Sequence, residues 1–132
     1  MNQFSKHVQK SYDLEERTAK FAERLMGLVK DVEHNDVNYI ISKQLLRSGI
    51  SMGANYCEAN AASLGRDFRN KIYLCKKETN ETKFHLRMIA KDSPALEDQL
   101  RVLWQEAHEL PLIFQKIATT IDAKKQKSSV GD

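Results

Sequence analysis

The sequence predicts an all-α protein that folds as an up-down-up-down four-helix bundle. Four long segments carry apolar residues at three- and four-residue spacings, the pattern of amphipathic helices. The connections are short, and only five Gly and two Pro occur among 132 residues. Four helices with one apolar stripe each bury those stripes together by packing as a bundle. We expect residues 11–122 to form it, with a flexible segment at 1–10 and a disordered polar, basic tail at 123–132.

The first two helices are predicted over about residues 11–32 and 36–63. Asp36 follows a break in the apolar pattern, and its side-chain oxygen is expected to cap the second helix by accepting from free backbone N–H groups. Gly65 is expected to end that helix, because glycine suits a C-terminal cap. The expected core positions are Leu14, Phe21, Leu25, Leu28, Val29 and Val32 in the first helix, and Val37, Ile40, Ile41 and Leu45 in the second.

The third helix is predicted over about residues 66–91, and the fourth begins at Pro94. Ser93 before Pro94 is a start signal, because proline at the first helical position loses no helical hydrogen bond. Pro111 lies inside the fourth helix and removes one such bond, so we expect a kink between Ala107 and Pro111. The expected core positions are Phe68, Ile72, Cys75, Leu86 and Ile89, then Leu96, Leu100, Leu103, Ala107, Leu110, Phe114, Ile117 and Ile121.

The second helix carries small residues on one face. Gly49, Gly53, Cys57 and Ala61 recur every fourth residue, and small side chains let another backbone approach closely. A glycine inside a helix costs about 0.5–1 kcal/mol relative to alanine, which indicates a packing reason for both glycines. The close neighbour is either another helix of the same subunit or another subunit, and the sequence leaves both open.

Motifs on the second and third helices resemble a known family. Residues 42–63 follow the pattern Q-L-x-R-[AS]-x-x-S-[IV]-x-x-N-x-x-E-A, and residues 67–89 contain [DE]-F-x-x-K-[LI] and K-E-x-x-E-[TS]. They resemble bacterial four-helix-bundle proteins first met as open reading frames in intervening sequences of large-subunit ribosomal RNA. The resemblance spans about residues 11–122, and the chain departs from the pattern at Met52, in the VEHND turn and at Pro111. The matching residues are Gln44, Leu45, Arg47, Ser48, Ser51, Asn55, Glu58 and Ala59, then Asp67, Phe68, Lys71, Ile72, Lys77, Glu78, Glu81 and Thr82.

What this resemblance implies about function is limited, because members of the family have no established enzymatic activity. They are similar in fold to the accessory variability proteins of diversity-generating retroelements, which are basic pentameric bundles that work with a reverse transcriptase and its RNA. The resemblance therefore implies a homo-oligomer, with a pentamer favoured. It also implies RNA or DNA, and a reverse transcriptase, as partners.

The residues themselves give no sign of catalytic chemistry. A di-iron site in a bundle needs Glu-x-x-His pairs on two helices, and these are absent. The four histidines are scattered, and we expect them to be solvated surface residues. Neither a nucleophile with a base nor a glycine-rich phosphate loop after a strand occurs. We predict no enzymatic activity, no metal and no cofactor.

The cysteines and the apolar content bear on the cellular location. Cys57 and Cys75 do not form a CxxC pair, and we expect small buried core residues there, with a disulfide as the alternative. No stretch approaches the roughly 20 apolar residues of a membrane helix, and the N-terminal residues lack the apolar centre of a secretion signal. We expect a cytoplasmic protein without membrane contact.

A set of polar residues on the second and third helices has two interpretations. Arg47 and Glu58 lie eleven residues apart, which returns close to the same helix face. Charges at such positions pair across helices and fix their register, which is the interpretation we favour. The alternative is an active site. The residues concerned are Arg47, Asn55, Glu58, Glu78 and Glu81.

The third helix also carries a basic stripe within an arc of about 120°, at 100° per residue. Tyr73, Asn80 and Phe84 lie inside this stripe, and the acidic residues lie outside it. Segregated positive charge with aromatic rings is typical of a surface that follows a phosphate backbone and stacks on bases. The alternative is pairing with acidic residues of another helix or subunit, which would leave a structural scaffold. The stripe consists of Arg66, Arg69, Lys76, Lys77, Lys83, Arg87 and Lys91.

Overall fold

The computed structural model describes residues 2–62 and 65–131, with side chains described for 14–62 and 65–124. Its four long helices are α1 (Asn2–Asp31), α2 (Asp36–Ala61), α3 (Arg66–Ala90) and α4 (Glu97–Gly131). A short 3-10 helix, η1 (Pro94–Leu96), precedes α4. Within the described residues there is no strand, so the predicted all-α class is confirmed.

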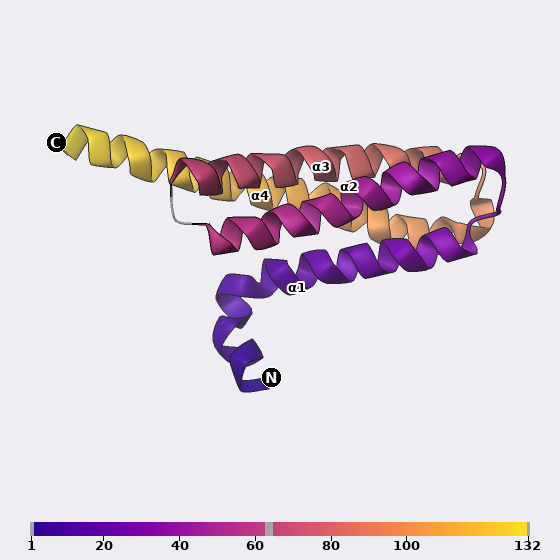
Figure 1. Cartoon of the computed structure of the whole chain (residues 1–132), viewed down its shortest axis with the longest axis horizontal. Coiled ribbons are helices and arrows are strands. Elements are labelled where there is room, and N and C mark those ends of the chain that lie inside the picture. Colours follow the sequence, from indigo (N-terminus) through magenta and orange to yellow (C-terminus); the bar gives the residue numbers. More distant parts are fainter. Residues whose placement is uncertain (1, 63–64, 132) are drawn as a thin grey trace.

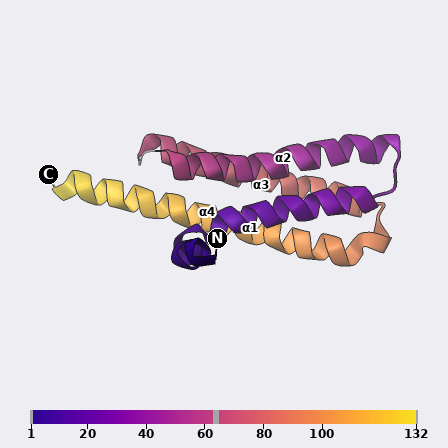
Figure 2. The ribbon, with the colours of Figure 1, turned by 60° about the horizontal axis from the view of Figure 1, so that its bottom comes forward.

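The helices form the predicted up-down-up-down bundle, since each long helix packs against its neighbour in the chain (Figure 1). α1 and α4 also touch, but they share less contact than any consecutive pair of long helices. The first turns of α1 bend away from the other helices, and the last turns of α4 extend beyond them (Figures 1 and 2). Both end helices are therefore longer than the sequence predicted, and flexibility of residues 1–10 and 123–132 in solution stays a prediction.

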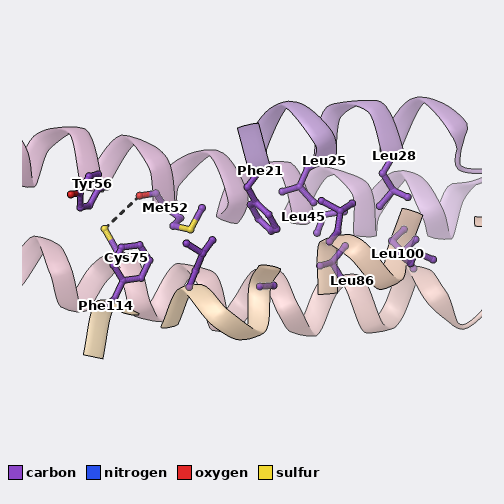
Figure 3. Close-up of a cluster of buried hydrophobic side chains, with 14 of the residues drawn as sticks. Phe21, Leu25, Leu28, Leu45, Met52, Tyr56, Cys75, Leu86, Leu100 and Phe114 are labelled. Carbon is purple, nitrogen blue, oxygen red and sulfur yellow. Dashed lines mark hydrogen bonds between the residues drawn. The ribbon is translucent and has the colours of Figure 1, made fainter. Parts of the chain in front are cut away.

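Apolar side chains from all four helices meet along the bundle axis (Figure 3). Phe21, Leu45, Ile72 and Phe114 are each fully buried, as the three- and four-residue spacings predict. Burial of one such side chain contributes about 1.5–3 kcal/mol relative to leaving it exposed. This shared core fixes which face of every helix points to solvent.

Two predicted core positions at the start of α2 are wrong. Val37 is 61% exposed and Ile40 is 63% exposed, whereas Asn38 and Ser42 are buried. Asn38 takes the inner position because its amide donates to the backbone oxygen of Glu33 in the α1–α2 turn, at 2.9 Å. This hydrogen bond gives the Glu33 carbonyl, just past the end of α1, a partner, and the apolar residues beside Asn38 are left on the outer surface.

Two predicted helix caps are also wrong. Asn35, not Asp36, caps α2, and its Oδ1 accepts from the backbone N–H of Asn38 at 2.8 Å. Gly65 precedes α3 with φ of 115°, a conformation that favours glycine, while α2 runs to Ala61 and its C-cap is Ala62.

The start and the interior of the last helix differ in detail from the prediction. Ser93 precedes Pro94 as expected, but its side chain makes no capping hydrogen bond, and the first turn is 3-10. α4 runs without interruption through Pro111. The kink between Ala107 and Pro111 stays a prediction.

The glycines of α2 face α1 of the same chain. A Cβ atom added at Gly49 would overlap the Cδ1 atom of Leu25, and one added at Gly53 would lie 3.7 Å from the Oγ1 atom of Thr18. Both glycines therefore allow a close contact inside the subunit. Ala61, at the end of the same face, is exposed.

The two thiols are free and differ in burial. Cys75 is buried as predicted, its Sγ lies 3.5 Å from the backbone oxygen of Met52 (Figure 3), and burial raises its pKa to about 12. The predicted burial of Cys57 is wrong, because its side chain is exposed, with Sγ 3.9 Å from Glu15 Oε1. Burial of part of the side chain and the nearby Glu15 carboxylate raise the pKa of the Cys57 thiol.

Candidate nucleic-acid interface

The basic stripe of α3 divides into two groups, because one edge of it faces α4. Ile72, Cys75, Leu86 and Ile89 point into the core and thereby orient the helix. Residues about a quarter turn away then lie beside α4, and those opposite the core lie on the outer surface. The two groups have different electrostatic surroundings.

Three cations of the stripe bind side chains of α4. The guanidinium of Arg69 donates to the carboxylate of Asp122, with Nε–Oδ1 at 2.6 Å. Lys76 donates to Gln115 Oε1 at 2.6 Å. Lys83 Nζ lies 2.9 Å from His108 Nδ1. These three residues hold α3 to α4, so their charge is only partly available to a ligand.

Aromatic rings accompany two of these three cations. The guanidinium of Arg69 lies 5.0 Å from the centre of the Tyr73 ring, and Lys83 Nζ lies 4.3 Å from that of Trp104. Trp104 also stacks on His108, with ring centres 5.5 Å apart. Such cation–π contacts stabilise exposed sites by about 0.5–1 kcal/mol, and they hold the cations further in place.

The other four cations of the stripe are exposed on the outer surface. They make no hydrogen bond or ion pair to any residue whose side chain the structure describes. They spread over the whole length of α3, from its first residue to the residue that caps its end. They are Arg66, Lys77, Arg87 and Lys91.

The outer face of α3 and the adjoining edge of α2 form an open hollow with a volume of about 750 Å³. Seven of its lining residues come from α3 and two from α2. Two rings, three cations, one carboxylate and three neutral polar side chains line it. They are Tyr73, Lys76, Lys77, Asn80, Glu81, Phe84 and His85 from α3, and Gln44 and Arg47 from α2.

Arg47 joins α2 to α3 at the rim of this hollow. Its Nη2 lies 2.6 Å from Glu81 Oε2, and its Nη1 lies 3.3 Å from Glu78 Oε2. Its Nε donates to the side-chain oxygen of Gln44 at 3.1 Å. The hydrogen bond that Arg47 donates to Glu81 raises the pKa of Arg47, which stays charged. The single guanidinium offsets one of the two glutamate charges, and three cations against one carboxylate among the lining residues leave the hollow positive.

His85 lies beside this ion pair and is partly buried. Burial lowers its pKa below the ordinary value of 6.5, the nearby Arg47 lowers it further, and Glu81 opposes both. The imidazole is therefore neutral at pH 7, with one ring nitrogen as donor and the other as acceptor. Partly buried groups with a shifted pKa in a concave surface are typical of binding sites.

The five residues considered together as a polar network are not brought together. Arg47, Glu78 and Glu81 form the contact just described. Glu58 instead accepts from Lys71 Nζ at 2.7 Å, and Asn55 donates to the backbone oxygen of Ser51 at 2.9 Å. The Glu58–Lys71 pair joins α2 to α3, and the Asn55 hydrogen bond lies within α2. Both contacts are structural, the role that we favoured from the sequence.

Sequence reasoning missed the α4 residues that hold the stripe, although a signal for them exists. Arg69, Lys76 and Lys83 are seven residues apart, and so are their partners His108, Gln115 and Asp122. Equal seven-residue spacing on two antiparallel helices is the pattern of flanking contacts in a coiled coil. A search for matched heptads would have found these pairs.

Metal binding and membrane spanning have no support among the described residues. No group of three or more His, Cys, Asp or Glu lies close enough to hold a metal ion. No described helix combines the length and the apolar character needed to cross a membrane.

Comparisons with known proteins agree with the fold. A family model for the 23S rRNA-intervening sequence protein matches residues 10–116. A crystal structure from Bacteroides thetaiotaomicron VPI-5482, described as a protein of unknown function from the S23 ribosomal protein family, has a TM-score of 0.71 and 31% sequence identity. The match covers 79% of this chain and 96% of that one. No curated protein has a significantly similar sequence. The chain belongs to the family of 23S rRNA-intervening sequence proteins, as its motifs predicted.

Proposed function

We propose that the protein is a non-enzymatic, homo-oligomeric helical bundle that binds nucleic acid, RNA or DNA, through the outer face of α3. The observation that carries this proposal is the row of exposed cations Arg66, Lys77, Arg87 and Lys91, which have no acidic partner among the described side chains. Phosphate contacts by such lysines and arginines supply most of the affinity of non-specific nucleic-acid binding.

The distribution of charge on other surfaces supports the choice of α3. The exposed side of α1 mixes both signs, with Glu15, Glu16 and Glu23 beside Lys20 and Arg24. A mixed surface is typical of solubility, whereas a surface of one sign attracts a ligand of the opposite sign. In an oligomer this face would be present in every subunit, so a modest charge per chain would become a larger positive surface.

A purely structural scaffold is the second candidate function. It is favoured by Arg69, Lys76 and Lys83, because these cations serve contacts inside the bundle. If the protein is a scaffold, the four exposed cations of the stripe serve only to keep the protein soluble.

The test is a gel-shift titration with single-stranded and structured RNA at several salt concentrations. If one chain contacts four phosphates of a single strand, the slope of log K against log salt should be about −2.8, because each contact contributes about −0.7. If the whole stripe of seven cations bound phosphate, the slope would be about −4.9. We expect the slope of about −2.8, because three of the seven cations are held by α4.

Two triple variants separate the α3 face from charge in general. K77E/R87E/K91E removes three exposed cations of the stripe without touching the contacts to α4, and we expect it to abolish binding. R24E/K30E/K43E changes the net charge by the same amount, at exposed positions of α1 and α2. It should bind far better than K77E/R87E/K91E. Absence of binding by the wild-type protein at low salt would favour the scaffold, and equal loss in both variants would show that the α3 face is not the site.

A further inference from the structure

We propose that the hollow beside α3 is a site for unpaired bases, in which single-stranded nucleic acid stacks on Tyr73 and Phe84 next to the phosphate-binding cations. This inference rests on the proposed function and narrows it, because the cations alone would accept a duplex equally well. It assigns the ligand to the single-stranded class.

Spacing along α3 places rings and polar groups in one line. Tyr73, Lys77, Asn80 and Phe84 follow one another at intervals of four, three and four residues, so they lie along the same side of the helix. The two rings are eleven residues apart, which corresponds to about 16 Å along a helix. One base cannot fill that distance, so each ring takes a base of its own.

Both aromatic rings of the hollow expose apolar surface to solvent, which is unfavourable unless a ligand covers it. Phe84 is 56% exposed and Tyr73 is 37% exposed. The Arg69 guanidinium lies over the Tyr73 ring, 5.0 Å from its centre, and the Phe84 ring meets the His85 ring at 71° with centres 6.0 Å apart. Rings with such neighbours lose little conformational entropy on binding, and stacking on a base would bury their apolar surface.

Polar groups beside the rings match the edges of bases. The amide of Asn80 has no hydrogen-bond partner among the described side chains. The amide nitrogen of Gln44 is also available, because Arg47 occupies only its oxygen. His85 adds a neutral ring with one donor and one acceptor, since burial lowers its pKa. Unpaired bases present the same mixture of donors and acceptors, which a duplex hides in its base pairs.

The composition of the hollow argues against a protein partner at this place. Only the two rings are apolar, and charged side chains lie between them. The buried centre of a protein–protein interface is depleted of charged residues, especially lysine. Rings interleaved with lysines and amides are instead typical of single-strand binding surfaces.

The experiment compares three fluorescently labelled probes of equal phosphate number by anisotropy: unstructured single-stranded RNA, the same strand without bases, and a duplex. We expect the wild-type protein to bind the single strand most tightly. Y73L/F84L should weaken that binding by about tenfold or more, because one base–ring stack is worth about 1–3 kcal/mol. Its binding to the abasic strand and the duplex should not change.

Control variants keep the outcomes distinct. Y73F/F84Y retains both rings and should bind the single strand like the wild type, and circular dichroism should show native helicity for both variants. Unchanged single-strand binding by Y73L/F84L, with loss in K77E/R87E/K91E, would overturn the base site and leave the proposed function intact. If no probe binds the wild-type protein, the proposed function itself fails. A change of molecular mass in Y73L/F84L would assign the rings to a protein interface and also overturn the inference.

Discussion

The hydroxyl groups of Ser48 and Thr82 connect α2 and α3 inside the core. Ser48 Oγ and Thr82 Oγ1 lie 2.7 Å apart, and Thr82 donates to the backbone oxygen of Glu78 at 2.8 Å. Ser48 Oγ also lies 3.3 Å from the backbone oxygen of Leu45, so each hydroxyl has a carbonyl acceptor on its own helix and either can donate across the pair. Both side chains are fully buried, and a buried hydroxyl without a partner costs about 1–3 kcal/mol. The pair therefore opposes any sliding of α2 along α3.

The two glycines of α2 should respond oppositely to alanine. G53A adds a methyl group at ordinary contact distance from Thr18 and gains helix propensity, so we expect about 0.5–1 kcal/mol of stabilisation. G49A forces Leu25 to move, and Leu25 is fully buried, so we expect about 1–3 kcal/mol of destabilisation. Urea unfolding followed by circular dichroism measures both. G27A is the control, since an added Cβ meets nothing there, and equal effects of G49A and G53A would contradict the close contact.

His85 should make stability depend on pH. Its pKa is below 6.5 in the folded protein, so the unfolded chain takes up a proton at a higher pH than the folded chain does. The free energy of unfolding should therefore fall as the pH drops below about 6.5, and H85Q should lose less over the same interval. Unfolding at pH 7.5, 6.0 and 5.0 tests this. H34Q, at an exposed turn position, should keep the wild-type dependence, and an identical dependence in H85Q would refute the role of burial.

At the scale of helices, the paired heptads of α3 and α4 set how these two helices align. We expect a double-mutant cycle of R69A and D122A to give a coupling of about 0.2–1 kcal/mol, the range of exposed ion pairs. Thermal unfolding monitored by circular dichroism provides the four free energies. The pair R101A and E97A, within one turn of α4, should give a coupling nearer 0.3–0.5 kcal/mol. No coupling between Arg69 and Asp122 would show that the alignment comes from the core alone.

Helix identity and most of the core could be predicted because apolar periodicity records which side of each helix is buried. Apolar periodicity placed Val37 and Ile40 in the core wrongly. There the inner position is taken by Asn38, whose amide donates to the Glu33 carbonyl, and the apolar residues lie on the outer surface. Periodicity also missed the division of the basic stripe, since the periodicity of one helix carries no information on its neighbour's side chains. The hollow depends on Gln44 and Arg47 meeting α3, a contact between distant segments that no local pattern contains.

At the scale of the whole molecule, the outer side of α2 is the surface we expect to carry the contact between subunits. Val37, Tyr39, Ile40 and Ile50 are each 48–69% exposed, and exposed apolar groups of this kind mark interaction sites. The glycine face does not serve this purpose at Gly49 and Gly53, because α1 covers both. A homo-oligomer, with a pentamer favoured by the resemblance, would bury the apolar outer side of α2.

One charged substitution on the outer side of α2 tests the proposed contact between subunits. We expect I40K to lower the molecular mass to that of a monomer in light scattering at micromolar concentration, because a lysine at the centre of an apolar contact cannot be desolvated cheaply. A19K adds the same charge at an exposed position on α1 and should keep the wild-type mass. A monomeric wild-type protein would contradict the proposed assembly.

The limited contact of α1 gives the bundle an uneven resistance to opening. α1 packs chiefly on α2, and it touches α4 less, through pairs such as Arg17 with Glu106 at 2.7 Å. Elements with few tertiary contacts open at lower free energy than the rest of a domain. Native-state hydrogen exchange should therefore report faster exchange for amides of α1 than for those of α3. Opening of α1 would uncover the face of α2 that carries Gly49 and Gly53. The α1 helix of a second copy could then pack on this face, so α1 is the segment through which two chains could swap.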